Sequence, residues 1–410
     1  MHALFYVSII LFFGYIMGKL VSLIKLPNVT GYLIAGLLIG PHILKFIPAN
    51  AVSNMGVISE VALGIIAFNI GSEFSIKQLK KLGSRIMILT LAQSFGAFAV
   101  VLAVLALLLK QPFPFSLVIA AIATATAPAA TVLVIKQYKA KGPVVDTLLP
   151  VVALDDAVCI IAFSITAAIA KLMINPAANT TLLMTITKPL LELLIAAIIG
   201  LGGGLLISIF KTKVRSEEEM LLVTLGTIFI AVALSHMWNV SDLIACMMVG
   251  ATVVNLVPSS HRIFNSIEKI SFPIYVAFFT LSGADLDIGV LKSIGIVGIG
   301  YILARALGKI VGAYLGSKAM KMTDTVQKYL GFTLLPQAGV AIGLSVSAQS
   351  ILPEYSSTIR TIVLSATLVY ELVGPVLTKM ALTRAGEIKT NVLTPGKQKS
   401  KKSLEVKENT

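Results

Sequence analysis

The sequence predicts an all-α, polytopic membrane protein with about thirteen transmembrane helices, two of them interrupted near the middle. Of the 410 residues, 57% are hydrophobic and 13% are charged, whereas soluble domains carry roughly 25% charged residues. The mean hydropathy is +0.93. Apolar runs of the length needed to cross about 30 Å of hydrocarbon recur from one end of the chain to the other. Together these observations exclude an ordinary soluble domain.

The predicted spans follow one another with short polar connections. The first, residues 1–20, has no basic n-region and no small-residue cleavage site, so we interpret it as an uncleaved spanning helix. The second, residues 29–47, is short and rich in glycine. Cys159 and Cys246 both fall inside spans, which leaves no disulfide framework or cysteine metal cluster. The thirteen runs are centred near residues 13, 36, 61, 98, 125, 159, 198, 229, 249, 275, 304, 339 and 368.

The net charge of +14 is distributed unevenly between the two sides of the predicted membrane domain. The loops after the odd-numbered spans, together with the C-terminal segment, hold 25 of the 33 Lys and Arg residues, and the opposite loops hold 6. Such a bias predicts a cytoplasmic C-terminus and an external N-terminus. The basic charge therefore indicates topology, and we expect no nucleic-acid partner.

Two spans carry a proline in their interior, Pro128 in the fifth and Pro336 in the twelfth. An interior proline costs about 3 kcal/mol, and the carbonyls that it frees need protein, water or an ion as partner. The two spans are seven apart, so they run in opposite directions, as in the inverted repeats of transporters. For either proline alone, a simple packing kink is the alternative. The residues beside the breaks that we single out are Thr124, Thr126, Gln337 and Gly339.

Asp155 and Asp156 lie in the middle of an apolar stretch, residues 144–174. Each intramembrane charge costs at least about 2.5 kcal/mol, so such residues usually serve ions or protons. Adjacent side chains on a helix point roughly 100° apart, so one can face a cavity and the other a neighbouring helix. Burial and a second negative charge both favour a protonated carboxyl group. The pair is therefore predicted to exchange a proton for a monovalent cation; a structural or capping pair is the alternative.

A cation at this pair needs further oxygen ligands, because hard cations prefer oxygen and lose hydration water on entry. The hydroxyls of Thr124 and Thr126, and the carbonyls freed by Pro128, are candidates. We expect Na⁺ or K⁺ at Asp156, and no cofactor.

Four further charged residues are predicted to lie in or near the membrane. Arg305 and Lys309 are one turn apart on the eleventh span, where a positive charge needs a partner. We expect Arg305 to pair with Asp155 and Lys309 to extend toward the cytoplasmic end. Glu73 either lines an entry funnel or is an ordinary acid at the end of a helix. Glu371 is interpreted as a buried structural hydrogen-bonding group.

Six short motifs, spread from residue 26 to about residue 375, resemble those of the monovalent cation:proton antiporter-2 family, the sodium/proton exchanger domain. The nearest branch is the short bacterial Na⁺/H⁺–K⁺ antiporters. The motifs read LPNVTGYL through GP at 26–41, GSEF at 71–74, TAPA at 126–129, LDDA at 154–157, Arg305 to Lys309, and LPQAG at 335–339.

The resemblance implies a homodimer in a bacterial plasma (inner) membrane, with an exchanger domain over residues 1–384. Its core would comprise approximately 84–174 and 290–384, with the two discontinuous helices crossing at their centres. Its dimerisation domain would comprise approximately 1–76 and 186–284, and the core would slide against it in an elevator-type cycle. In such families the second aspartate, here Asp156, is the main ion ligand, and the first, here Asp155, bonds a basic residue of the eleventh helix. Residues 385–410 are polar and rich in lysine, which predicts a short, disordered basic tail.

The function implied is exchange of Na⁺, with K⁺ and Li⁺ as alternatives, for protons, and not enzymatic catalysis. Electrogenic members place a lysine where this chain has Arg305, and arginine effectively cannot release a proton. The aspartate pair therefore indicates electrogenic exchange, whereas Arg305 indicates electroneutral exchange. A sodium-coupled organic-anion symporter is the main alternative, although it would need a larger polar cavity. An aspartyl protease needs acids from different helices, and a cation channel needs a continuous pore.

Overall fold

The computed structural model describes residues 2–72, 74–76, 83–174, 182–211, 214, 216–258, 260–287, 289 and 294–388. Throughout this part of the chain the regular structure is helical, as predicted. Each of the thirteen predicted centres lies in a helix or at the break between two short helices. Seven of the described helices are long and apolar enough to cross a membrane by themselves, and several shorter apolar helices accompany them. The predicted fold class is confirmed.

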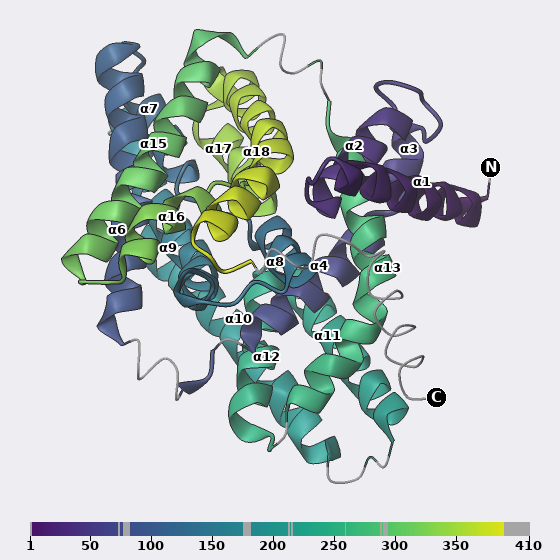
Figure 1. Ribbon diagram of the computed structural model, residues 1–410. Helices are drawn as coiled ribbons and strands as arrows, with labels where there is room; N and C mark the ends of the chain where they lie inside the picture. The colour runs from purple at the N-terminus through teal and green to yellow at the C-terminus, as the bar shows by residue number, and fades with distance from the viewer. Residues whose placement is uncertain are drawn as a thin grey trace.

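The helices succeed one another through short connections (Figure 1). The first half of the chain comprises α1 (Ala3–Leu23), α2 (Asn28–Ile39), α3 (Ala49–Asn54), α4 (Gly56–Gly71), α6 (Ser84–Ala103), a π-helical turn (Val104–Leu108), α7 (Phe113–Ile122), α8 (Pro128–Tyr138) and α9 (Pro143–Ile174). The second half comprises α10 (Leu182–Lys211), α11 (Glu217–Met237), α12 (Asp242–Leu256), α13 (His261–Asp285), α15 (Gly295–Ala319), α16 (Asp324–Thr333), α17 (Gly339–Ile351), a 3₁₀ turn (Pro353–Tyr355) and α18 (Ser356–Arg384).

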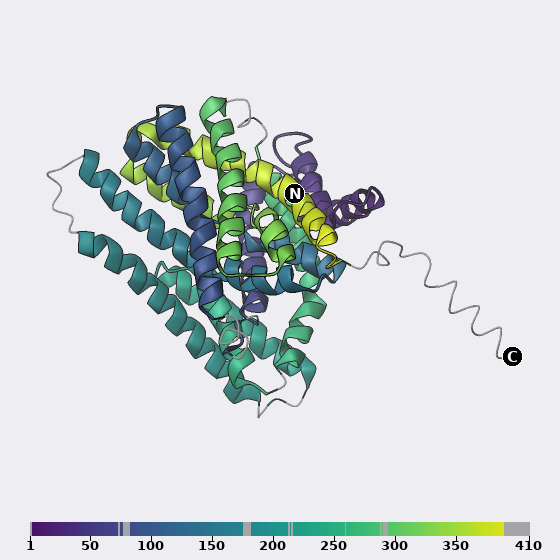
Figure 2. The ribbon, with the colours of Figure 1, turned by 60° about the vertical axis from the view of Figure 1, so that its left-hand side comes forward.

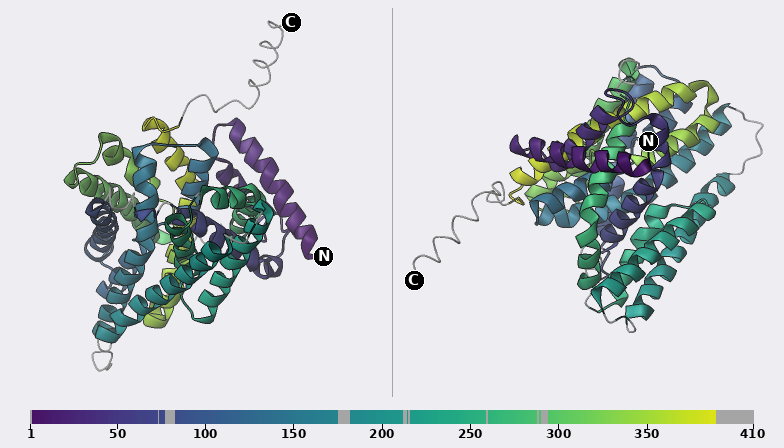
Figure 3. Two further views of the ribbon diagram at one scale, coloured as in Figure 1. Left: turned by 90° about the horizontal axis from the view of Figure 1, so that it is seen from below. Right: turned by 90° about the vertical axis from the view of Figure 1, so that its right-hand side faces the viewer.

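The helices group into two sides joined through a central apolar core. α6, α7, α15, α17 and α18 lie together on one side, and α1, α2, α3 and α13 lie on the other (Figure 1). A buried cluster that includes Phe115, Tyr301 and Ile359 fills the first side. α1 runs along the periphery (Figure 3), and α10 together with the C-terminal part of α9 forms an outer edge (Figure 2). The division into core and dimerisation domains stays a prediction.

The fifth and twelfth predicted spans are both discontinuous helices, as expected. α7 ends at Ile122 and α8 begins at Pro128, while α16 ends at Thr333 and α17 begins at Gly339. Pro128 occupies the first turn of α8, where its missing N–H costs nothing. Pro336 lies within the extended break itself. The breaks touch, because the N–H of Ala127 donates to the carbonyl of Pro336 at 2.9 Å.

α6 and α15 pack with their backbones in contact. A Cβ atom on Gly96 would lie 2.6 Å from the carbonyl oxygen of Gly308, and one on Gly308 would lie 2.5 Å from the carbonyl oxygen of Gly96. Only glycine permits this approach, as in other tightly packed membrane helices. The close packing brings Gln93 of α6 within hydrogen-bonding reach of Lys309 of α15.

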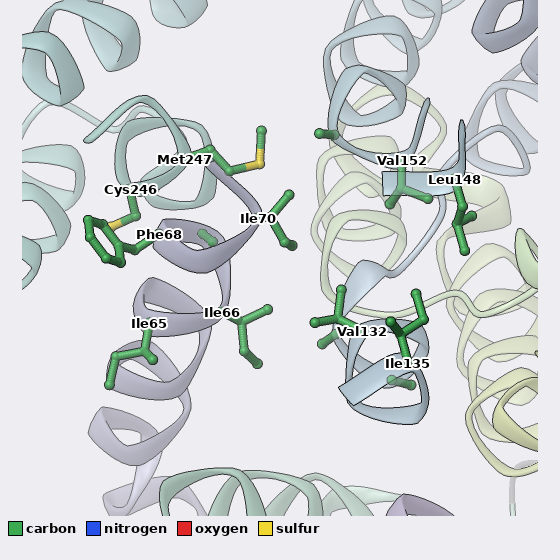
Figure 4. Packing of buried hydrophobic residues seen from close by; sticks show 14 of the residues in the cluster. Ile65, Ile66, Phe68, Ile70, Val132, Ile135, Leu148, Val152, Cys246 and Met247 are labelled. Atoms are coloured by element: carbon green, nitrogen blue, oxygen red, sulfur yellow. The ribbon is translucent and has the colours of Figure 1, made fainter. Parts of the chain in front are cut away.

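An apolar contact closes the space between α4 and the α8–α9 pair. Ile66 and Ile70 of α4 point toward Val132 of α8 and Val152 of α9 (Figure 4), and all four belong to the largest buried cluster. The side chains that face one another here are apolar.

Candidate ion-binding site

The two adjacent aspartates lie in the middle of α9 and are fully enclosed by protein. Asp155 is 0% exposed and Asp156 is 1% exposed. Burying a carboxylate is costly unless it is paired or hydrogen-bonded, so the partners of each carboxylate indicate its role.

Asp155 is the fully partnered member of the pair. One carboxylate oxygen accepts hydrogen bonds from Gln93 Nε2 and Ser94 Oγ, both at 2.5 Å. The other oxygen accepts from Lys309 Nζ at 3.0 Å, which makes a buried ion pair. Because every oxygen is bonded and the charge is balanced, Asp155 is held in one position.

Lys309 is the centre of this polar network. Besides Asp155, its ammonium nitrogen lies 2.5 Å from Gln93 Oε1, 2.5 Å from the carbonyl oxygen of Thr124 and 2.8 Å from Thr126 Oγ1. The three N–H groups are therefore shared among four acceptors. The Thr124 carbonyl lies in the break between α7 and α8, so it has no helical N–H partner. Lys309 thus links α6, the break between α7 and α8, and α9.

Arg305, one turn away on α15, satisfies backbone carbonyls at both helix breaks. Its guanidinium donates to the carbonyls of Ala123 at 3.0 Å and Ala125 at 2.5 Å, in the first break. It also donates to the carbonyl of Leu335 at 2.7 Å, in the second break, and it lies 4.5 Å from the centre of the Tyr370 ring. This side chain joins the two discontinuous helices.

The expected pairing of Arg305 with Asp155 is therefore wrong, as is the expected extension of Lys309 toward the cytoplasmic end. Lys309 makes the ion pair, and both basic side chains are 0% exposed. The physical reason is that the C-terminal ends of α7 and α16 carry partial negative charge. A planar guanidinium can span several carbonyls at such ends, whereas a single ammonium suits the carboxylate.

Gln337 completes the second break. Its amide donates to the carbonyl of Ile122 at 3.2 Å and to the hydroxyl of Tyr301 at 2.9 Å. Gly339, the first residue of α17, lies two positions further along the chain. The predicted break residues are therefore brought together at the crossing, on the side where Arg305 and Lys309 lie.

Asp156 differs from its neighbour because its carboxylate is unpartnered. Both oxygens are buried, and neither has a hydrogen-bond partner in the part of the chain that the structure describes. The freed carbonyls that the sequence offered as cation ligands are occupied by Arg305 and Lys309. Thr124 Oγ1 donates to the carbonyl of Ala121, and Thr126 Oγ1 accepts from Lys309. An unpartnered carboxylate at this depth needs a proton or a cation.

A cavity of about 640 Å³ leads from the surface to the helix breaks. It begins among exposed residues at the end of the molecule formed by α3 and the C-terminus of α13, such as Ser53 and Asp285. It ends at Thr126 and Pro128 of the first break and Ala338 of the second. Asp156 is not part of its described lining.

The sequence analysis did not single out several residues of the site. Gln93 and Ser94 bond Asp155 directly, and the signal for them was a pair of polar residues inside an apolar span. Tyr301 and Tyr370 support Gln337 and Arg305 and carry no comparable signal. Glu73 lies outside the described residues.

The fold and the site together define a class of protein. Two oppositely directed discontinuous helices that cross beside buried charged groups are typical of secondary transporters. The chain belongs to the sodium/hydrogen exchanger family, since the family model for the transmembrane sodium/hydrogen exchanger matches residues 8–384. It is therefore a multi-pass membrane transporter of the cation:proton exchange type, and not an enzyme. No curated protein matches the chain.

Solved structures with the same fold include the sodium proton antiporter MjNhaP1 from Methanocaldococcus jannaschii. Its structure at pH 8 is similar with a TM-score of 0.69 and 20% identity, over 94% of this chain and 98% of that chain. An electron-microscopy structure of the same antiporter gives a TM-score of 0.74 and 18% identity, with the same coverage. These likenesses support the antiporter fold; the antiporter-2 branch stays a prediction.

Proposed function

We propose that the protein exchanges Na⁺ for H⁺ across a bacterial plasma membrane, with K⁺ and Li⁺ as further candidate cations, by an elevator-type cycle. The observation that carries this proposal is the buried, unpartnered carboxylate of Asp156. A cation and a proton that compete for one such group cannot both occupy it, and this exclusion couples their movements. Thr126, near the inner end of the cavity, is proposed to guide the cation toward Asp156.

The conformation supports alternating access with one side open. The cavity opens where the uneven distribution of Lys and Arg predicts the external side, at Ser53 and Asp285. The opposite side is closed by the apolar contact of Ile66 and Ile70 with α8 and α9. We take this as the outward-facing state, from which movement of the core against the α4 side would open the cytoplasmic path.

The contacts of Lys309 support electrogenic exchange. A buried lysine can release its proton, whereas arginine effectively cannot. Arg305 does not argue against electrogenic exchange, because the ammonium group beside Asp155 belongs to Lys309. We therefore infer that Lys309 is a second proton carrier and that Arg305 serves structure. The homodimer and the two-domain division rest on the family resemblance.

The cavity's charges disfavour the symport of an organic anion. Its described lining contains three ionisable side chains, Asp242, Asp285 and Glu371, and all three are acidic. Negative groups in a cleft of low dielectric attract cations and repel anions.

The experiment that tests the proposal uses purified protein in proteoliposomes with an imposed pH gradient and a lumenal pH dye. Na⁺, K⁺ and Li⁺ are added separately, and choline serves as the control. We expect Na⁺, and not choline, to dissipate the gradient. A gradient that survives all three cations would contradict cation:proton exchange.

A further inference from the structure

The inner part of the cavity carries two polar side chains that the Asp156 site does not use. Thr367 and Glu371 lie four residues apart on α18, so they share one face of the helix. Both line the cavity, although each is buried, with 2% of Thr367 and 7% of Glu371 exposed. They are therefore reached from the cavity and covered elsewhere by protein.

Neither side chain is satisfied by the surrounding protein. Thr367 Oγ1 has no hydrogen-bond partner among the described residues. Glu371 likewise makes no ion pair or hydrogen bond within the described chain. The structural hydrogen bond expected for Glu371 from the sequence is therefore not what the structure shows. A buried carboxyl group without partners is stable only when it holds a proton or a cation.

Glu371 also lies beside the crossing of the discontinuous helices. One turn further along α18, a Cβ atom on Gly374 would lie 2.8 Å from Cγ of Pro336 in the second break. The same cavity reaches Thr126 and Ala338, one from each break. At the mouth of the cavity the acidic groups Asp242 and Asp285 are accessible to solvent. Acidic side chains therefore occur both at the entrance and at the buried end.

We propose that Glu371 and Thr367 form a second binding station for a monovalent cation, which the transported ion occupies between bulk solvent and Asp156. A carboxylate, a hydroxyl and the water that fits in the cavity are the oxygen ligands that hard cations prefer. The station rests on the proposed cation:proton exchange, since it names a further site for the same transported ion.

Equilibrium binding separates this station from the Asp156 site. Binding of ²²Na⁺ is measured on purified full-length protein carrying Asp156→Asn, with and without Glu371→Gln. We expect Asp156→Asn protein to retain Na⁺ binding, and the added Glu371→Gln to weaken it by roughly tenfold or more, as for other lost buried charges. An Asp156→Asn protein that binds no Na⁺, or whose binding survives Glu371→Gln, would overturn the station. If the exchange proposal itself is wrong, wild-type protein will show no Na⁺-dependent proton movement. This result is distinct from the binding results that test the station.

A matched pair of threonines tests the station during transport. Thr367 and Thr378 are both on α18, and both have a buried hydroxyl without a partner among the described residues. Thr367 lines the cavity and Thr378 is not part of its described lining. We expect Thr367→Val to raise the KM for Na⁺ supplied from the cavity side, with kcat and melting temperature unchanged, and Thr378→Val to leave that KM unchanged. Equal KM values for the two variants would contradict the proposal.

Discussion

Asp155 and Asp156 are neighbours in the chain and equally buried, yet their carboxylates are in opposite situations. Asp155 accepts hydrogen bonds from Gln93, Ser94 and Lys309, whereas Asp156 accepts none from the described residues. A satisfied ion pair contributes to structure, and an unsatisfied carboxylate is available to a transported ion. The difference arises because the two side chains leave the helix roughly 100° apart.

Asparagine substitutions at the two positions are expected to affect stability differently. Asp155→Asn leaves the Lys309 ammonium buried without its counter-charge, and breaking a buried pair in this way costs about 3–5 kcal/mol. Asp156→Asn removes no hydrogen bond seen in the structure. Thermal unfolding of the purified variants should therefore show a lower melting temperature for Asp155→Asn alone. Equal melting temperatures would contradict the assigned roles.

Replacing Lys309 with arginine is expected to change the charge balance of transport. The variant keeps a positive charge beside Asp155 but loses a group that can release a proton. Wild-type exchange should respond to an imposed membrane potential, which supplies about 2.3 kcal/mol per charge for each 100 mV, and the Lys309→Arg variant should not. Lys318→Arg, at an exposed position on the same helix, is the control. An unchanged response in Lys309→Arg would refute the role of Lys309 as a proton carrier.

At the scale of the element, the sequence predicts the two discontinuous helices but not the hydrogen bonds that join their breaks. Pro128 and Pro336 mark the two breaks in the sequence, because proline leaves a carbonyl without its N–H partner. The partner of those carbonyls depends on where α15 passes, which local sequence does not reveal. For the same reason the sequence suggested Asp155, which carries a full negative charge, as the partner of Arg305. Helix ends, which carry only partial charge, were its actual partners.

Arg305→Lys is expected to destabilise the crossing although it conserves charge. A lysine cannot reach carbonyls of both breaks with a planar fork. The loss of two hydrogen bonds to a charged group costs about 3 kcal/mol or more. Thermal unfolding should show a clear decrease in melting temperature, compared with Arg360→Lys at an exposed position of α18. If both variants unfolded at the same temperature, the joining role of Arg305 would be wrong.

At the scale of the whole molecule, composition was sufficient to predict a bundle of spanning helices, but not the cavity. Thirteen apolar runs identify the helices, and their short connections constrain how neighbours pack. The cavity depends on long-range packing between α4, α12, α13 and α18, which no local pattern specifies. The polar residues that line it, such as Thr367 and Glu371, therefore resembled ordinary buried groups in the sequence.

The orientation of the cavity has a direct consequence for chemical labelling. Ser53 is exposed at the mouth of the cavity, and Lys141 is exposed in a loop predicted to be cytoplasmic. The native Cys159 and Cys246 are buried and should contribute little background. In intact cells, a membrane-impermeant maleimide should label Ser53→Cys and not Lys141→Cys. The reverse pattern would invert the predicted topology.

The central claim is that the carboxylate of Asp156 carries the transported cation. Its most direct test is ²²Na⁺ uptake into proteoliposomes driven by an imposed pH gradient, for wild-type protein and Asp156→Asn reconstituted in equal amounts. We predict gradient-driven uptake by the wild type and none by Asp156→Asn, although the variant folds with an undiminished melting temperature. Uptake at the wild-type rate by Asp156→Asn would show that this carboxylate does not carry the ion, and would contradict the proposed mechanism.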